Sequence, residues 1–419
     1  MSEIRRLTAQ GIEEYVDIVI DAYPGFKISS EEDRRRLIER LQKVQEEVPP
    51  LHLYGLYRED RLLGGMRLHD FWLNVLGTEV SAGGVGMVAV DLLHKKEHVA
   101  KELLLFFLEH YRRRGARMAL LYPFRPDFYY AMHFGYGAKI SQYRFRPAAL
   151  RRGPSKAEVR SLSAEDRSAL AACYDRYQAQ THGMIVRHAH EWDPWFRNLG
   201  LENRIAGCVL DDRLEGYLIF GFKARPVESP LRNDLVVKEL VYTSREALAE
   251  LLTFLHSQAD QVERIILATH DASFHHLLLD PRDECETLIP SVYHESNVQG
   301  VGLMYRIIDV PGIFDDLRDH DFNGQSCRLK LTVSDSFLPG NAGSTLLHFE
   351  AGRVTLPGSG EHEVELALNV AELSSLLMGV VDLRSLHTYG LAELSEAAYL
   401  ETLNRLFAVE QKPVCLTAF

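Results

Sequence analysis

The stretch VAVDLLHKKEHVAKELLLFFLEHYRRRG, residues 88–115, changes its pattern twice. A β-branched run stops at Asp91, a short polar segment follows, and apolar residues then recur at helical spacing. These periods predict a strand, a tight turn and a helix over Val99–Arg114. Lys95 and Lys96 fall in the turn, at the positive end of the helix dipole, where cations are disfavoured. The pair therefore raises the question of what anion the turn holds.

A helix start presents backbone N–H groups without partners inside the helix, and these favour anions. A phosphate ligand would explain both lysines; the alternative is that they are solvated and that Glu97 offsets one of them. The glycine-rich GGVG at residues 83–86 precedes the strand instead of following it, so it does not fit a dinucleotide-binding loop. It predicts a turn or a bulge.

The bulk composition is that of a globular protein: 419 residues, 46% hydrophobic and 25% charged. The net charge of -12 argues against a nucleic-acid binder, which needs a basic face, and is compatible with a cationic substrate. The five cysteines are widely spaced without a C-x-x-C pair, which favours reduced thiols and a cytoplasmic location. Neither a signal peptide nor a membrane span is predicted.

Three blocks follow one another, and we expect domains over residues 1–150, 151–293 and 294–419. The first two resemble an internal repeat, because DRLLGG at Asp60 and DRLEGY at Asp212 are offset by 152 residues. The same offset aligns VGMVAV with VKELVY, and in both blocks a helical segment and a further β run come next. The third block shows a run of strands and then helices. The fold class is therefore α+β with mixed sheets.

The strand and turn of the opening stretch resemble the coenzyme motif of the GNAT acetyltransferases, V-x-V followed by [RQ]-x-x-G-x-[GA] at a helix start. The resemblance implies that the strand backbone pairs with the pantetheine arm of acetyl-CoA and that the turn holds its pyrophosphate. His98 stands where the family has glycine, a residue used for positive φ or close backbone approach. The coenzyme-binding residues implied by the motif are Val88, Ala89, Val90, Lys95, Lys96, Glu97, His98, Val99 and Ala100.

YPFRPDFYYAMHFGYG, residues 122–137, resembles a second segment of the same enzymes, P-F-x-x-x-F-Y-x-x-x-G-[FW]. The tyrosine that acts as the acid in the family falls on Tyr129, with Tyr130 as the neighbouring candidate; counting back from the later glycine gives Ala131. His133 again stands where a glycine is usual. The alternative is an aromatic packing cluster.

The whole chain resembles the Eis (enhanced intracellular survival) group of GNAT proteins. The resemblance implies a catalytic GNAT domain, a degenerate GNAT-like domain, a sterol-carrier-protein-like C-terminal domain and a hexamer. It also implies that the chain terminus enters the active site, where the α-carboxylate of Phe419 is the general base. From the residues alone, the apolar ending KPVCLTAF also fits a final strand that completes a sheet.

The function implied is acetyl transfer from acetyl-CoA to a primary amine of an aminoglycoside, a polyamine or a lysine side chain. Three other hypotheses stay open: a ligand-binding protein with a decayed coenzyme loop and a lipid-type third domain, a scaffold, and a metal site. RHAHEWD suggests the last, because His-x-His on a strand puts both imidazoles on one face. It offers no evident third ligand, and we expect no metal.

Overall fold

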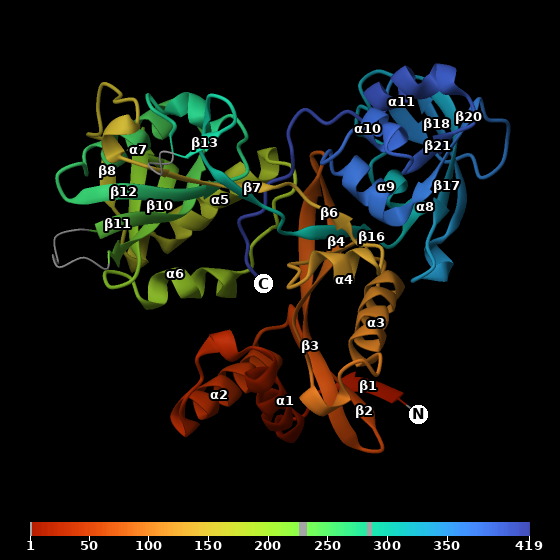
Figure 1. The fold of residues 1–419 in the computed structure, drawn as a ribbon, viewed down its shortest axis with the longest axis horizontal. Helices are drawn as coiled ribbons and strands as arrows, with labels where there is room; N and C mark the ends of the chain where they lie inside the picture. Colours follow the sequence, from red (N-terminus) through yellow and green to blue (C-terminus); the bar gives the residue numbers. More distant parts are fainter. Residues whose placement is uncertain (1, 226–232, 283–286) are drawn as a thin grey trace. The chain divides into compact units, whose positions relative to one another are not determined.

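The structure, a computed structural model, describes residues 2–225, 233–282 and 287–419, and it divides into two compact units. Unit 1 runs to Gly137, resumes over Leu303–Lys412 and ends with Ala418–Phe419. Unit 2 holds Ala138–Gly302 and Pro413–Thr417. Each unit contains one seven-stranded sheet, and unit 1 also contains a five-stranded sheet (Figure 1).

The first sheet has the strand order β1-β2-β3-β4-β5-β16-β6. Every pair in it is antiparallel except β4 with β5, so the sheet is mixed as predicted. Its strands are β1 (Ser2–Arg6), β2 (Leu51–Arg58), β3 (Arg61–Val75), β4 (Thr78–Val90), β5 (Met118–Leu121), β16 (Met304–Ile307) and β6 (Gly135–Tyr136). The helices that accompany it are α1 (Ala9–Ala22), α2 (Glu31–Glu47), α3 (Val99–Arg113) and α4 (Pro126–Tyr130).

Helix α3 confirms the periodicity of the opening stretch and lies along β3 and β4 (Figure 1). Its apolar positions, among them Leu104, Phe107 and Leu108, are fully buried in the core of the first sheet. The helix ends one residue earlier than predicted, and Gly115 follows at φ 82°, the left-handed conformation that commonly terminates helices.

The second sheet has the order β15-β7-β12-β11-β10-β9-β8. Its strands are β15 (Val298–Gly300), β7 (Ile140–Phe145), β12 (Val262–Thr269), β11 (Asn233–Tyr242), β10 (Arg213–Ala224), β9 (Arg204–Leu210) and β8 (Val159–Ser161). It packs with α5 (Arg167–Gln180) and α7 (Arg245–His256), and the short α6 (Asp193–Arg197) lies in the same unit.

The predicted repeat is visible in the residue at which the parallel strand pair of each sheet ends. Strand β4 pairs in parallel with β5 up to Val85, and β11 pairs in parallel with β12 up to Val237. Since 237 − 85 = 152, the two central strands lose their parallel neighbours at positions separated by the predicted offset. Beyond these points the described residues of β4 pair only with β3, and those of β11 only with β10.

Neither unit is one continuous segment of the chain, because each seven-stranded sheet contains a strand from beyond an expected domain boundary. Residues of β7 lie before the expected division at 150 and yet join the second sheet. Residues of β16 follow the expected division at 293 and join the first sheet. The expected domains follow chain order, whereas the sheets are completed by strands from beyond these divisions.

The C-terminal part of unit 1 has the sheet order β19-β18-β17-β20-β21, with helices on it, which confirms the predicted α+β pattern. The strands are β17 (Cys327–Ser334), β18 (Gly343–Glu350), β19 (Arg353–Thr355), β20 (Val364–Asn369) and β21 (Ala392–Leu394). The helices are α8 (Val310–Asp316), α9 (Val370–Leu377), α10 (Leu383–Thr388) and α11 (Leu400–Leu406). Two short strands, β13 (Leu288–Ile289) and β14 (Tyr293–His294), form a separate hairpin in unit 2.

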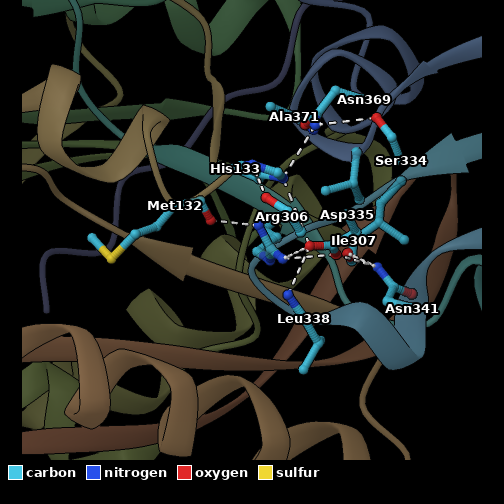
Figure 2. A network of polar contacts seen from close by, with 12 residues as sticks. Met132, His133, Arg306, Ile307, Ser334, Asp335, Leu338, Asn341, Asn369 and Ala371 are labelled. Atoms are coloured by element: carbon cyan, nitrogen blue, oxygen red, sulfur yellow. Dashed lines mark hydrogen bonds and ion pairs between the residues drawn. The ribbon is translucent and has the colours of Figure 1, made fainter.

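A buried polar network ties β16 to the C-terminal part of unit 1 (Figure 2). Arg306 is fully buried, and its Nη2 lies 2.7 Å from both carboxylate oxygens of Asp335. Arg306 also donates to the carbonyl of Met132 at 2.5 Å, and Asn341 donates to Asp335 at 3.2 Å. Removing one member of such a pair strands a buried charge and costs about 3–5 kcal/mol. The network therefore fixes this part of the fold against the first sheet.

Candidate active site

The C-terminal residue lies on the first sheet. The ring of Phe419 packs at centroid distances of 4.9 Å from Phe71, 5.4 Å from His69 and 5.2 Å from Tyr122. Residues 411–419, all described, adopt neither helix nor strand, so the alternative of a final strand is wrong. The chain end instead packs by aromatic contacts beside Gly84 and Gly86 of β4.

Two glycines of GGVG make room for this chain end. A methyl group added at Gly84 would lie 2.4 Å from the Phe71 ring and 3.1 Å from the Phe419 ring. One added at Gly86 would lie 3.1 Å from the carboxyl carbon of Phe419 and 3.7 Å from Nη2 of Arg67. The carboxyl group thus rests on bare backbone at Gly86, with a guanidinium close by. GGVG forms no turn, but the predicted bulge follows directly, at Met87.

The bulge places an extra residue on β4 just after the last parallel pair between β4 and β5. Met87 has φ 52°, and its carbonyl accepts a hydrogen bond from the Tyr15 hydroxyl. The carbonyl of Val88 accepts one from the Tyr23 hydroxyl at 2.7 Å. Both tyrosines come from α1 and the turn after it. Any ligand that pairs with this strand must therefore use the remaining backbone groups between Gly86 and Val90.

The turn between β4 and α3 presents its charged residues to solvent. A 3-10 turn over Leu92–His94 is followed by Lys95 and Lys96, both exposed. Within the part of the chain that the structure describes, neither lysine forms an ion pair. Glu97 pairs with Arg58 and His94, at 3.5 and 3.0 Å, so the interpretation that it offsets a lysine is wrong. The two cations are available to an anion.

Helix α3 begins with uncovered N–H groups. His98 is its N-cap residue, and no described side chain caps the helix at this end. His98 has φ 63° and ψ 8°, the left-handed conformation of the glycine that it replaces. Residues other than glycine, asparagine and aspartate seldom adopt it. The backbone of the turn therefore keeps the glycine-like shape, with an exposed imidazole added.

His133 repeats the substitution, at φ 62°. Its ring is held on both sides: Asn369 donates to Nδ1 at 3.1 Å, and the Ser336 hydroxyl lies 3.2 Å from Nε2 (Figure 2). Burial and the nearby Arg306 lower the pKa of His133, so the ring is neutral at pH 7. Side chains from the C-terminal part of unit 1 thus hold this residue in the conformation of the missing glycine.

The two candidate tyrosines differ sharply. Tyr129 is 3% exposed and packs edge-on against Phe128 and Phe134, and no described group hydrogen-bonds its hydroxyl. Tyr130, the next residue of α4, donates its hydroxyl to Glu372 at 2.5 Å and stacks on Tyr136. Burial, with Tyr23 nearby, raises the pKa of Tyr129. Tyr129 has a hydroxyl to offer a ligand, whereas Tyr130 is engaged in the fold.

The hypothetical metal site is not built. His188 and His190 lie at a 3-10 turn, Ala189–Trp192, and not on a strand, and their rings are 5.9 Å apart. Among described residues, no cluster of three histidine, cysteine, aspartate or glutamate side chains is arranged around a common point. The described cysteines, Cys173, Cys208, Cys327 and Cys415, form no disulfide, and Cys285 lies outside the described residues. In the described ranges, no helix combines the length and the apolar character that a bilayer crossing requires.

Three residues around Phe419 were not predicted from the sequence. Arg67, His69 and Phe71 occupy alternate positions of β3 and therefore share one face. Arg67 donates its Nε to Nε2 of His69 at 2.9 Å, and burial lowers the pKa of Arg67. The signal was available: an arginine and a histidine at alternate positions of an otherwise apolar strand are unusual in a core.

Three family models match the chain. Residues 3–138 match one described as an acetyltransferase (GNAT) domain, and residues 183–307 match a second with the same description. Residues 315–416 match a sterol carrier protein domain. The order of the three matches agrees with the order of domains predicted from the repeat and the third block.

A relative from Streptomyces griseus, described as an uncharacterized N-acetyltransferase, is 26% identical over 391 residues, which cover 87% of this chain and 88% of its own. Two solved structures share the fold over the full length of both chains. A GCN5-related N-acetyltransferase from Anabaena variabilis has a TM-score of 0.83 at 18% identity, and Eis1 from Mycobacterium abscessus has 0.77 at 20%. The chain is thus a GNAT-family N-acetyltransferase with tandem GNAT domains and a C-terminal sterol-carrier-protein domain.

Proposed function

We propose that this protein is an Eis-like N-acetyltransferase that transfers acetyl from acetyl-CoA directly to a primary amine. The observation that carries the proposal is the position of the Phe419 carboxyl group, against Gly86 on the strand where the first sheet parts. The resemblance to the GNAT motif implies that the backbone of this strand pairs with the pantetheine arm of acetyl-CoA. A chain end seated there brings an anionic oxygen to the reaction centre.

The α-carboxylate of Phe419 acts as the general base. Its reference pKa of about 3.3–3.7 keeps it ionised at neutral pH, so it attracts an ammonium group and accepts its proton. The Arg67 guanidinium lies on the same side of Gly86 as the carboxyl group, and its positive charge further favours the ionised carboxylate. The rings of Phe71, His69 and Tyr122 limit how far the terminal residue can turn.

Tyr129 acts as the acid. Its raised pKa keeps the phenol protonated over the whole range in which enzymes are assayed, so it can donate to a departing thiolate. The absence of a described partner for its hydroxyl supports this assignment, as does the engagement of Tyr130 with Glu372. Backbone N–H groups near Val90 would stabilise the oxyanion, a contribution of roughly 3 kcal/mol elsewhere.

The coenzyme site is the turn and the start of α3. Acetyl-CoA supplies the activated acyl group when it binds. Lys95 and Lys96 would contact its phosphates, and the uncapped N–H groups after His98 would receive the pyrophosphate. The remaining motif residues (Val88, Ala89, Val90, Glu97, Val99 and Ala100) would shape the strand edge and the helix start. The glycine-like φ of His98 supports a working turn over the alternative of a decayed one.

The acceptor is a primary amine, as in an aminoglycoside, a polyamine or a lysine side chain. The net charge of -12 favours cationic acceptors by raising their concentration near the surface. A homo-oligomer, hexameric as in the Eis group, belongs to the same proposal.

The test is thiol release from acetyl-CoA across a panel of amines. Tyr129→Phe should lower kcat about a hundred-fold while the KM for acetyl-CoA changes little, because it removes a proton donor and no ground-state contact. Tyr130→Phe is the matched control: it removes the neighbouring hydroxyl and should leave kcat within about three-fold. Equal losses in both variants, or none in Tyr129→Phe, would contradict the assignment of the acid.

A further inference from the structure

An arginine of the first sheet lies beside the Phe419 carboxyl group without an ion-pair partner. Arg67 of β3 is paired across the sheet with Gly86 of β4, and its Nη2 would lie 3.7 Å from a methyl group added at that glycine. Its Nε donates to Nε2 of His69 at 2.9 Å. Among the residues that the structure describes, no aspartate, glutamate or chain terminus forms an ion pair with Arg67. The N–H donors of both Nη groups are therefore available to a ligand.

The missing counter-charge is costly at this position. Arg67 is partly buried, and burial is the main cause that lowers its pKa. The guanidinium still carries its charge at neutral pH, since the reference pKa of arginine is about 12.5–13.8. A charge withdrawn from water is unfavourable unless it is paired. A charged group kept in this state beside reacting groups is typical of a ligand site.

A second arginine adds to the positive charge at this point. Burial lowers the pKa of Arg67 most, and the charge of Arg40, on α2, lowers it further, so the two guanidinium groups act on one another. Arg40 is exposed, and no side chain in the described ranges forms an ion pair with it. By contrast, Arg35 and Arg36 of the same helix each pair with a glutamate four residues away. Two cations without counter-charges, one from β3 and one from α2, favour an anion between them.

The Phe419 carboxylate is close to Arg67 but does not pair with it. The carboxyl carbon would lie 3.1 Å from the same added methyl group at Gly86, so the carboxylate and the guanidinium occupy one side of that glycine. No ion pair joins these two described groups. A ligand that carries both signs of charge fits this arrangement, with an ammonium group against the carboxylate and an anionic group against the guanidinium.

We propose that the acceptor is an α-amino acid, whose carboxylate binds Arg67, with Arg40 adding positive charge, while its ammonium group meets the Phe419 carboxylate. The inference rests on the proposed function, because it takes the Phe419 carboxylate as the base. Both protein groups lie within 4 Å of one point above Gly86, so the two charges of the ligand must be close together, as they are on a single carbon atom. An arginine fork matches a carboxylate with two parallel hydrogen bonds. Polyamines and aminoglycosides carry further cations and no anion, so both arginines repel them.

The transfer has the α-nitrogen as its nucleophile. The ammonium group gives a proton to the Phe419 carboxylate, the nitrogen bonds to the acetyl carbon, and the C–S bond of the thioester breaks. Tyr129 protonates the leaving thiolate and regains a proton from the acylated nitrogen. The products are an N-acetyl amino acid, the thiol of coenzyme A and one proton.

The first test compares substrates that differ only at the carboxylate. Thiol release from acetyl-CoA is measured with a panel of L-amino acids and with their α-amides, which keep the primary amine and lose the negative charge. The kcat/KM of the best amino acid should exceed that of its amide, of a polyamine and of an aminoglycoside at least about ten-fold. If any of these three is used as well as the amino acid, the inference is overturned and the proposed function stands. Absence of thiol release with every amine is a different failure, because it overturns the proposed function itself.

The second test assigns this preference to the two arginines. Arg67→Gln removes the charge, so the ratio of kcat/KM between the amino acid and its amide should fall to about one, mainly through the KM for the amino acid. Because the ratio compares two substrates of one protein, a general loss of active enzyme cancels. Arg40→Ala, at an exposed position, should lower the ratio about two- to three-fold, and by less at high ionic strength. Arg35→Ala is the matched control on the same helix and should not change the ratio. If Arg67→Gln or Arg40→Ala leaves the ratio unchanged, the inference is overturned.

Discussion

In both GNAT folds the central strand loses its parallel neighbour at the same position of the repeat, yet the helix that follows begins differently in each. Helix α7 is capped: the Ser244 side chain accepts a hydrogen bond from the Ala247 N–H at 3.1 Å. Helix α3 begins at His98 without a described side-chain cap. A helix start has four N–H groups without intrahelical partners, and the Ser244 cap occupies one of those of α7, whereas no described side chain occupies any of those of α3. The first copy therefore leaves its helix start without a described side-chain cap, which is what the proposed phosphate site requires, and the second copy does not.

The two copies also differ in the part of the central strand that follows its last parallel pair. Position 86 of the first copy is glycine, and the equivalent position 238 of the second copy is an exposed lysine that donates to Asn203 at 2.6 Å. Bare backbone in the first copy receives the carboxyl group of Phe419. In the second copy, the next residue, Glu239, is engaged with Arg187. The first copy thus has bare backbone beside Phe419, whereas the second has a hydrogen-bonded lysine and an ion-paired glutamate at the equivalent stretch.

The first prediction concerns Gly86. Gly86→Ala should lower kcat about ten-fold, because its methyl group would lie 3.1 Å from the Phe419 carboxyl carbon and displace it. Lys238→Ala at the equivalent position should leave kcat unchanged. Steady-state kinetics on both variants checks the expectation. An unaltered kcat in Gly86→Ala would show that the carboxyl group does not need this seat.

The second prediction concerns the lysines of the turn. Lys95→Ala combined with Lys96→Ala should raise the KM for acetyl-CoA about five- to ten-fold, and raising ionic strength should shrink that difference, because exposed charges are screened. Arg245→Ala, at the start of the capped helix, is the control and should not change this KM. Equal responses at the two helix starts would remove the distinction between the copies.

The third prediction concerns Ser244, the N-cap residue of α7. Ser244→Ala should lower the free energy of unfolding by about 1 kcal/mol, the usual contribution of a serine cap, without changing the KM for acetyl-CoA. Denaturant unfolding and kinetics measure the two effects separately. A changed KM would mean that the second copy also binds coenzyme.

The fourth prediction compares two histidines at the same position of the two helices, eleven residues after each helix begins. His256 in α7 pairs through Nδ1 with the carbonyl of Leu150 at 3.0 Å, whereas the buried Nε2 of His110 in α3 has no partner among described residues. Burial, with Arg114 nearby, lowers the pKa of His110 to about 4. The unfolded chain, with a histidine pKa of about 6.5, therefore binds the extra proton between these values.

It follows that this stability contribution is complete above about pH 6.5 and is lost as the pH falls towards 4. In His110→Phe the midpoint of thermal unfolding should fall less steeply over this range than in the natural chain. An identical slope in both proteins would contradict the lowered pKa of His110.

Pattern and spacing predicted the repeated elements because those depend on local sequence: helix α3 follows from periodicity and the bulge from glycine placement, whereas the residue at which the parallel pairing ends was not predicted. The exchange of β7 and β16 between sheets was not predictable, since a strand's partner is chosen by long-range packing. The conformation of His98 could not be read from its residue type, because histidine seldom adopts positive φ. The rings that pack on Phe419 come from two separate segments, β3 and the residue after β5, and only the alternation of Arg67, His69 and Phe71 hinted at this arrangement.

The most direct test of the account changes a single functional group, converting the α-carboxylate of Phe419 to a carboxamide by joining a synthetic C-terminal peptide to the rest of the chain. The amide keeps the ring in its seat but can neither carry the charge nor accept the amine proton. If the carboxylate is the base, kcat falls at least about a hundred-fold relative to a carboxylate chain assembled in the same way, with the KM for acetyl-CoA nearly unchanged. Equal turnover by the two chains would contradict it.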